Sequence, residues 1–309
     1  MTDTGHIPVL QKDVIATLGP NDDDDIIVDL TAGRGGHAEL LARHCKPKLV
    51  LLFDLDKENL DYARARVESQ GVEVQAFHAN FATAANTIMN LGISANIVLA
   101  DLGVASNQLK QANRGLSFMH EGPLDMRLNP ESGNTAADLV QNLDENELAD
   151  LIYTLGEDPF ARQIARKIVF ERQKEPILDT VRLAKIVRAS YGFKAKKSRL
   201  NPATRTFMAL RIAVNNELVA LDALLKDVEM GCRKVGKSGW LSLDARIGVI
   251  SFHSLEDRRV KQAFVSLEKK GIAKRITRKP IQVSDEEAAN NPRARSAKLR
   301  VIKVAQRDL

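Results

Sequence analysis

The stretch Asp29-Leu-Thr-Ala-Gly33-Arg-Gly35-Gly36-His37 decides the fold of this 309-residue chain. The apolar residues 26–30 lead into it and predict a strand, and residues 38–45 after it can form a helix. Glycines at such a turn let the backbone pass close to a ligand, and the start of the helix supplies free N–H groups. The stretch therefore predicts a strand–turn–helix unit with a ligand at the beginning of its helix.

The glycine spacing fits two kinds of ligand. The pattern Gly33-x-Gly35-x-x-Ala38 could be a dinucleotide fingerprint, which would make the chain an NAD-dependent oxidoreductase. The pattern Asp29-x-x-x-Gly33-x-Gly35 suits S-adenosylmethionine, which has no pyrophosphate. A carboxylate at Asp29 would repel a pyrophosphate but could neutralise the cationic methionine end, directly or through water. The second ligand is favoured, and a glycine turn without any ligand remains the third interpretation.

Strand and helix patterns alternate in the first third of the chain. Apolar runs at 49–54 and 95–102 carry an acid at Asp54 and Asp101, at or next to their ends. Residues 72–78 alternate like a strand, and residues 59–68 have helical spacing. Strands and helices in this order predict an α/β fold with a parallel sheet and right-handed crossovers.

The alternation stops after Asp101, and residues 111–197 contain no convincing strand. Helices are expected instead at 145–155, 160–173, 180–190 and 206–228. Strand patterns resume at 246–252 and 299–305. We therefore expect a sheet domain interrupted by a helical insertion, with boundaries at 1–110, 111–204 and 205–309.

Three further residues follow predicted strands and are expected at the ligand edge of the sheet. Asp54 comes 19 residues after Gly35, where an acid typically accepts both ribose hydroxyls of a nucleotide. Asp101 ends the fourth strand, where an ordinary Asx turn is the alternative. Phe81 follows the third strand and could pack against an adenine, or belong to the core instead. Asp56 is the weaker ribose candidate and is expected to cap the next helix.

The charge distribution favours a polyanionic partner. Residues 156–205 carry thirteen Lys and Arg against five Asp and Glu, and residues 258–303 carry fourteen against four. The whole chain carries +5, so everything outside these segments carries −13. Two basic segments on an acidic remainder are typical of nucleic-acid binding, although a plain basic surface is an equal alternative on charge alone.

Composition excludes several other classes. Hydrophobic residues make up 44% and charged residues 28%, so the chain can bury a core, and no run approaches a membrane span. Cys45 and Cys232 are too few for a zinc site, and no metal is expected. The first residues lack a signal-peptide pattern, which favours a reduced, cytoplasmic protein. The sequence carries no signal for an oligomeric state.

The chain resembles the bacterial 16S ribosomal RNA cytosine-N4 methyltransferases nearly from end to end. The resemblance lies in the glycine stretch and in HIPVL at 6–10, RGLSFMHEGPLDMR at 114–127, NPATRTF at 201–207, VISFHSLEDR at 249–258 and NPRARSAKLR at 291–300. It departs from the family at Ala105-Ser106-Asn-Gln108-Leu-Lys110, where two serines and an acid are usual, and at Asn201, where His is usual. Residues 240–246 look like extra length before a strand.

The resemblance implies a class I Rossmann-like S-adenosylmethionine methyltransferase sheet with an inserted all-helical domain. The implied substrate is a cytidine in the decoding region of 16S rRNA, within the small ribosomal subunit. The implied cofactor residues are Gly35, Gly36, His37, Asp54, Phe81, Asp101 and Gln108.

Catalytic and substrate roles are assigned more broadly. Asp101 and His253, each following a strand, are the catalytic candidates. The substrate candidates lie in the insertion and in the basic segments: Asp125, Arg127, Arg199, Asn201, Arg205, Arg293 and Arg295. Glu256, Asp257 and Arg258 are expected to cap the helix after His253. A non-catalytic RNA-binding or ribosome-assembly factor that kept a nucleotide-like pocket is the alternative function.

Overall fold

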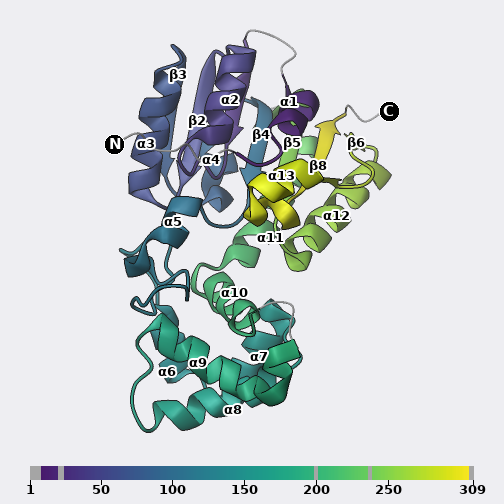
Figure 1. The fold of residues 1–309 in the computed structure, drawn as a ribbon. Coiled ribbons are helices and arrows are strands. Elements are labelled where there is room, and N and C mark those ends of the chain that lie inside the picture. Colours follow the sequence, from purple (N-terminus) through teal and green to yellow (C-terminus); the bar gives the residue numbers. More distant parts are fainter. Residues whose placement is uncertain (1–7, 20–23, 198–200, 236–238, 306–309) are drawn as a thin grey trace. The chain divides into compact units, whose positions relative to one another are not determined.

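The computed structural model describes residues 8–19, 24–197, 201–235 and 239–305, and the chain divides into two compact units. Unit 1 joins Met1–Gly103 to Leu218–Leu309, and unit 2 is Val104–Glu217 (Figure 1). These unit boundaries differ from the predicted domain boundaries at 110 and 204. No helix among the described residues is long and apolar enough to cross a membrane.

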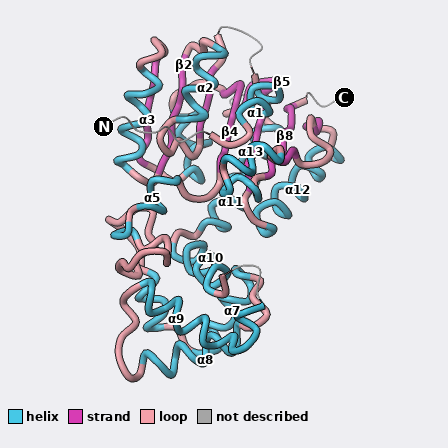
Figure 2. The backbone as a smooth tube through the Cα atoms, viewed as in Figure 1, coloured by secondary structure: helices cyan, strands magenta, loops and turns pink. Residues whose placement is uncertain are grey.

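Unit 1 is built on a mixed sheet, whose strands are magenta in Figure 2. The described strands run in the order β3-β2-β1-β4-β5-β8-β6, with β7 beside β8. The strands are β1 (Ile26–Asp29), β2 (Leu49–Asp54), β3 (Glu73–His78), β4 (Ala95–Asp101), β5 (Leu241–Ser251), β6 (Ala273–Arg275), β7 (Ile281–Gln282) and β8 (Lys298–Val304). Strands β1 to β5 are parallel, and β8 is antiparallel to β5, β6 and β7. The predicted parallel α/β sheet is confirmed.

The helices of unit 1 pack on this sheet. They are α1 (Gln11–Leu18), α2 (Gly36–Cys45), α3 (Lys57–Glu68), α4 (Ala84–Asn90), α11 (Glu217–Arg233, of which the first residue belongs to unit 2), α12 (Ser254–Lys269) and α13 (Asp285–Asn290). Apolar side chains of α1, α2 and α3 form one core with alternate residues of the sheet strands. The first five residues of β2 are all buried, so both faces of the sheet are covered there.

The strand order reverses between β1 and β4. The chain runs from β1 through α2 to β2 on one side, whereas β4 pairs with β1 on the other side. In open α/β sheets a ligand binds at such a reversal, outside the carboxyl ends of the strands. The topology therefore places the ligand edge at the ends of β1, β2 and β4.

Unit 2 is helical, as predicted, and its described residues form no strand beyond an isolated bridge between Pro123 and Asp179. Its α-helices are α5 (Ser106–Lys110), α6 (Ala136–Asn142), α7 (Glu145–Gly156), α8 (Ala161–Arg172), α9 (Thr180–Tyr191) and α10 (Ala203–Val214). They enclose an apolar core that contains Leu148, Ile164 and Leu210.

The single long helix predicted at 206–228 is wrong. Helix α10 ends at Val214 and α11 begins at Glu217, with Asn216 in the left-handed region at φ +51°. The Asn215 side chain accepts the Leu128 N–H at 2.7 Å and donates to the Met126 carbonyl at 2.8 Å. Because Asn215 bonds to this distant loop, the helix stops instead of continuing into α11. The apolar periodicity of the sequence could not reveal such a break.

The extra length at 240–246 is absorbed into β5, which begins at Leu241. Ala95 pairs with Leu241 and Ile97 pairs with Arg246, so the residues between them bulge from the ladder. Asp244 in this bulge has φ +64°. The short strands β6 and β7 were not predicted, because two or three residues carry too little pattern.

Candidate active site

Three aspartates mark the carboxyl ends of neighbouring parallel strands. Asp29 ends β1, Asp54 ends β2 and Asp101 ends β4. Asp29 is opposite Leu52 of β2 and Leu99 of β4, so Asp54 and Asp101 both extend two residues beyond it. The sheet thus brings together the acids that the sequence analysis selected.

The glycine turn connects the first of these strands to α2. Gly33 and Gly35 have φ of +50° and +74°, a backbone region that residues other than glycine rarely adopt. A Cβ on Gly35 would lie 3.0 Å from the Ala63 Cα of α3. Glycine is therefore required at Gly35 both for the turn and for the close packing of α2 on α3.

Asp54 is held by the same turn. One carboxylate oxygen accepts the Gly33 N–H at 2.7 Å, and the other accepts the Asp56 N–H at 2.8 Å. Burial raises the pKa of Asp54 to about 6, although these N–H bonds act in the opposite direction. Asp56 caps α3 by accepting the Asn59 N–H, so its predicted role as a helix cap is confirmed.

His37 connects the start of α2 to the end of β4. Its Nε2 lies 3.3 Å from Asp101 Oδ2, and its side chain is 6% exposed. Burial alone would lower the pKa of His37, but the Asp101 and Asp29 carboxylates outweigh burial and raise it. His37 Nδ1 and Asp101 Oδ1 are buried without a hydrogen-bond partner among the described residues. His37 Nε2 likewise makes no hydrogen bond and has only its ion-pair contact with Asp101, so the polar atoms of this pair are incompletely satisfied, a condition that a bound ligand would relieve.

Asp29 lies near the His37–Asp101 pair, and its charge acts on His37. Its side chain is 1% exposed, and one oxygen accepts the Thr31 N–H at 3.1 Å. Burial raises the pKa of Asp29 to about 6, while the charge of His37 lowers it. Because the carboxylate is covered, its charge acts on His37 and not by direct contact with a ligand.

Thr31 is a site residue that the sequence analysis missed. Its hydroxyl accepts the Asp101 backbone N–H at 2.6 Å, which fixes the end of β4 to the glycine turn. Its position between Asp29 and Gly33 was the only available signal.

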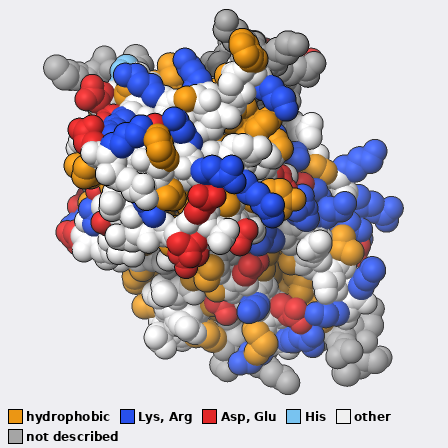
Figure 3. Space-filling view, turned by 90° about the horizontal axis from the view of Figure 1, so that it is seen from below, with side chains coloured by type: hydrophobic (Ala, Val, Ile, Leu, Met, Phe, Trp, Pro, Cys, Tyr) orange, Lys and Arg blue, Asp and Glu red, His pale blue; other side chains and the backbone are white. Residues whose placement is uncertain are grey.

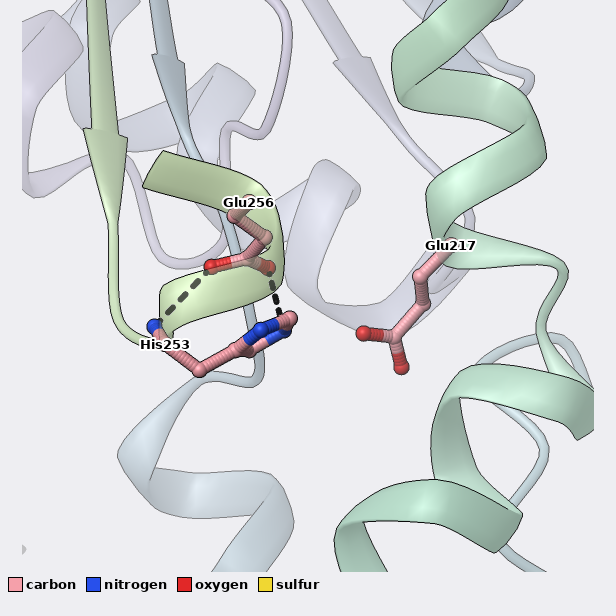
Figure 4. A group of neighbouring side chains, drawn as sticks. All are labelled: Glu217, His253 and Glu256. Carbon is pink, nitrogen blue, oxygen red and sulfur yellow. Dashed lines mark hydrogen bonds and ion pairs between the residues drawn. The ribbon is translucent and has the colours of Figure 1, made fainter. Parts of the chain in front are cut away.

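Phe81 and His253 follow two other strands of unit 1. Phe81 is half-buried and begins a short 3₁₀ helix (Phe81–Thr83) after β3. His253 precedes α12, after β5, and its Nε2 lies 3.1 Å from Glu256 Oε1 (Figure 4). Glu217, also drawn in Figure 4, belongs to unit 2, where its carboxylate pairs with Arg211 at 2.8 Å.

The predicted cap of α12 is only partly correct. Glu256 accepts the backbone N–H groups of Phe252 and His253, at 2.8 and 3.4 Å, and so acts as the cap. Asp257 instead binds Arg300 of β8 through both carboxylate oxygens, at 2.7 and 3.2 Å. The sequence could not show this pair because 43 residues separate its members.

Several predicted residues make contacts within unit 2. Gln108 is buried in α5 and accepts the Ala105 N–H at 2.9 Å. Arg127 binds both oxygens of Asp125, at 2.8 and 2.7 Å. Asn201 accepts the Ala203 N–H at the start of α10, and Arg205 donates to the Glu157 carbonyl at the end of α7. Each of these residues therefore has a structural contact of its own, and their substrate or cofactor roles remain predictions.

The remaining substrate candidates are basic. Arg199 lies outside the described residues, and the Arg293 side chain is likewise not described, whereas Arg295 is exposed. Other exposed basic residues of the second basic segment are Arg258, Lys261, Lys269, Lys270, Lys274, Arg278 and Lys279. Lys and Arg side chains gather on the face of the molecule shown in Figure 3.

Comparisons with known proteins show which family this chain is similar to. The family model of the MraW methylase family matches residues 3–305. A protein named ribosomal RNA small subunit methyltransferase H from Synechococcus sp. (strain CC9311) is 42% identical over 304 residues, which cover 96% of this chain and 93% of its own length. A protein of the same name from Anaeromyxobacter sp. (strain K) is 42% identical over 316 residues, covering 97% and 98%. A solved rRNA methylase from Streptococcus thermophilus aligns with 96% of this chain and 94% of its own, at 12% identity and a TM-score of 0.38.

Proposed function

The chain belongs to the MraW methylase family, and from this membership we propose that it methylates the exocyclic N4 of a cytidine in the decoding region of 16S rRNA. It is an S-adenosylmethionine-dependent rRNA methyltransferase. The finer assignment, to the N4 atom, to 16S rRNA in the small subunit and to the cytoplasm, is the proposal.

The residues at the ligand edge fit this cofactor. Asp54 carries acceptor oxygens at the end of β2, and Gly35 and Gly36 open the first turn of α2, whose N–H groups have no intrahelical partner. The unpartnered His37 Nδ1 and Asp101 Oδ1 add a ring nitrogen and an acceptor oxygen. When bound, S-adenosylmethionine supplies a methyl group already activated by its sulfonium charge.

The arrangement around Asp101 is the main structural support for methylation of an amine. The backbone N–H of Asp101 is fixed by Thr31, and one carboxylate oxygen faces His37. The Asp101 side chain is 23% exposed, so in the proposal its carboxylate can be approached and accepts a hydrogen of the substrate amine. The amine of cytosine is a poor nucleophile because its lone pair is delocalised into the ring. An acceptor for one amine hydrogen favours the pyramidal amine and so raises its nucleophilicity.

His253 is the second catalytic candidate. It follows β5, the strand next to β4, and Glu256 holds its ring at the start of α12. In the proposal it orients the base or a phosphate of the substrate. The basic residues of both segments hold the RNA backbone, and unit 2 takes part in substrate binding.

The test is transfer of a labelled methyl group from S-adenosylmethionine to purified RNA. We expect label in small-subunit particles or their RNA, and none in large-subunit RNA offered at the same concentration. Asp101→Ala should lose transfer, while exposed Asp61→Ala should keep it. Binding of small-subunit RNA without any transfer by the parent protein would instead support the non-catalytic assembly factor.

A further inference from the structure

Residues Pro8, Val9 and Leu10 lie against the first turn of α2. A Cβ built on Gly36, the first residue of α2, would come 2.7 Å from Pro8 Cγ, so the two residues are in close contact. Val9 and Leu10 are 6% and 1% exposed and share one apolar core with Ala38 of the same helix. This short segment therefore packs against the turn that carries Gly36 and His37.

Leu10 holds an unusual backbone conformation where the segment enters α1. Its φ is +54°, in the left-handed region that β-carbon-bearing residues seldom adopt, and no side chain caps α1 there. Its backbone N–H donates to Glu287 Oε1 at 2.7 Å, across 277 residues of sequence. The Glu287 carboxylate therefore holds the backbone of Leu10 in place through this N–H.

Glu287 stands where a glutamate could complete a capping box at the start of α13, but its carboxylate bonds elsewhere. Ser284 caps α13 by accepting the Glu287 N–H at 3.1 Å, and a Glu at this position ordinarily returns the bond to the cap residue's N–H. Here its carboxylate crosses to Leu10 instead. Ala294 and Ala297, which follow α13, are fully buried in the same core as Leu10. The chain after β7 therefore packs beside the N-terminal segment, and Glu287 bonds the two together.

We propose that Glu287 is a positioning residue for cofactor binding: by accepting the Leu10 N–H, it holds residues 8–10 against the first turn of α2 and so keeps Gly36 and His37 in place. This inference rests on the proposed cofactor site. Glu287 touches neither cofactor nor substrate in it. Its hydrogen bond reaches the site through Leu10, Pro8 and Gly36, all within unit 1, and its charge also contributes to the raised pKa of His37.

Three substitutions separate the hydrogen bond from the charge. Glu287→Ala removes both, Glu287→Gln keeps an acceptor oxygen without the charge, and Glu287→Asp keeps the charge on a side chain too short to reach. The control is Glu286→Ala, which removes an exposed neighbouring carboxylate. Affinity for S-adenosylmethionine is measured by titration calorimetry, together with kcat and KM for the cofactor.

Glu287→Ala and Glu287→Asp should weaken cofactor binding about tenfold, the effect of losing one charge-assisted hydrogen bond, with the change in KM larger than that in kcat. Glu287→Gln should stay within about threefold of the parent, since one hydrogen bond is retained. If Glu287→Asp binds like the parent while Glu287→Gln does not, the charge matters and the bond does not, which overturns the proposal.

A lower melting temperature with unchanged cofactor affinity in folded Glu287→Ala would also overturn it, because Glu287 would then be only structural. Failure of the proposed function looks different. In that case the parent protein itself would not bind S-adenosylmethionine, whatever stands at Glu287.

Discussion

His37 Nε2 lies 3.3 Å from Asp101 Oδ2, which ties the first turn of α2 to the end of β4 across the point where the strand order reverses. The remaining polar atoms of both side chains, His37 Nδ1 and Asp101 Oδ1, are buried and have no hydrogen-bond partner among the described residues. Buried polar atoms without partners are costly, so a ligand that bonds to these atoms is favoured.

Removing the Asp54 carboxylate should weaken cofactor binding. Asp54→Ala is expected to lower the affinity for S-adenosylmethionine by at least tenfold, about 1.4 kcal/mol, because an acceptor for the ribose hydroxyls is lost. The same change frees the Gly33 N–H that Asp54 accepts. Calorimetry on the folded variant checks it, with Asp61→Ala as the matched control. An unchanged affinity would show that Asp54 does not bind the ribose of the cofactor.

The buried charge of Asp29 should cost stability at neutral pH. Its pKa is about 6 in the folded protein against 3.8 for an ordinary aspartate, so the unfolded chain ionises first as the pH rises. The contribution of Asp29 to stability therefore falls between pH 3.8 and about 6 and stays low above that range.

Asp29→Asn removes this loss and keeps an acceptor for the Thr31 N–H. We expect the variant to be more stable than the parent at pH 7.5, by up to about 3 kcal/mol, and the difference to shrink at pH 4.5. Urea unfolding at both pH values measures it. A difference that does not change with pH would show that Asp29 is not the titrating group.

The sequence was sufficient for the central sheet because strand ends and glycine turns are local patterns. Asp29, Asp54 and Asp101 each end an apolar run, and parallel strands must bring such ends to one edge. Contacts between segments that are distant in the sequence could not be predicted from it. The break at Asn215 depends on a loop at Met126 and Leu128, and the bond from Leu10 to Glu287 joins the two ends of the chain.

The arginines after α13 should contact RNA phosphates. Arg295 is exposed and makes one long bond, to the Ala288 carbonyl at 3.4 Å. Phosphate contacts release counterions, so Arg293→Ala combined with Arg295→Ala should flatten the slope of log K against log salt by about one to two units. RNA binding measured at several salt concentrations checks this. An unaltered slope would mean that neither arginine touches the RNA backbone.

Neither cysteine should be needed for catalysis. Methylation of cytosine at ring carbon 5 generally requires a thiolate that attacks carbon 6, whereas the exocyclic amine attacks the methyl group directly. Cys45 and Cys232 are 3% and 4% exposed, and burial raises the pKa of their thiols to about 11 and about 12. Cys45→Ala with Cys232→Ala should therefore retain methyl transfer within a few-fold. Loss of activity in a folded double variant would contradict attack by the amine.

The most direct test is the identity and position of the methylated nucleoside. Small-subunit RNA lacking the modification is incubated with the protein and S-adenosylmethionine, cleaved into fragments and examined by mass spectrometry, and its nucleosides are compared with N4- and C5-methylcytidine standards. We expect one new methyl group, on N4 of a cytidine in a decoding-region fragment, and none with Asp101→Ala. A methyl group on carbon 5, on another base or outside the decoding region would contradict it.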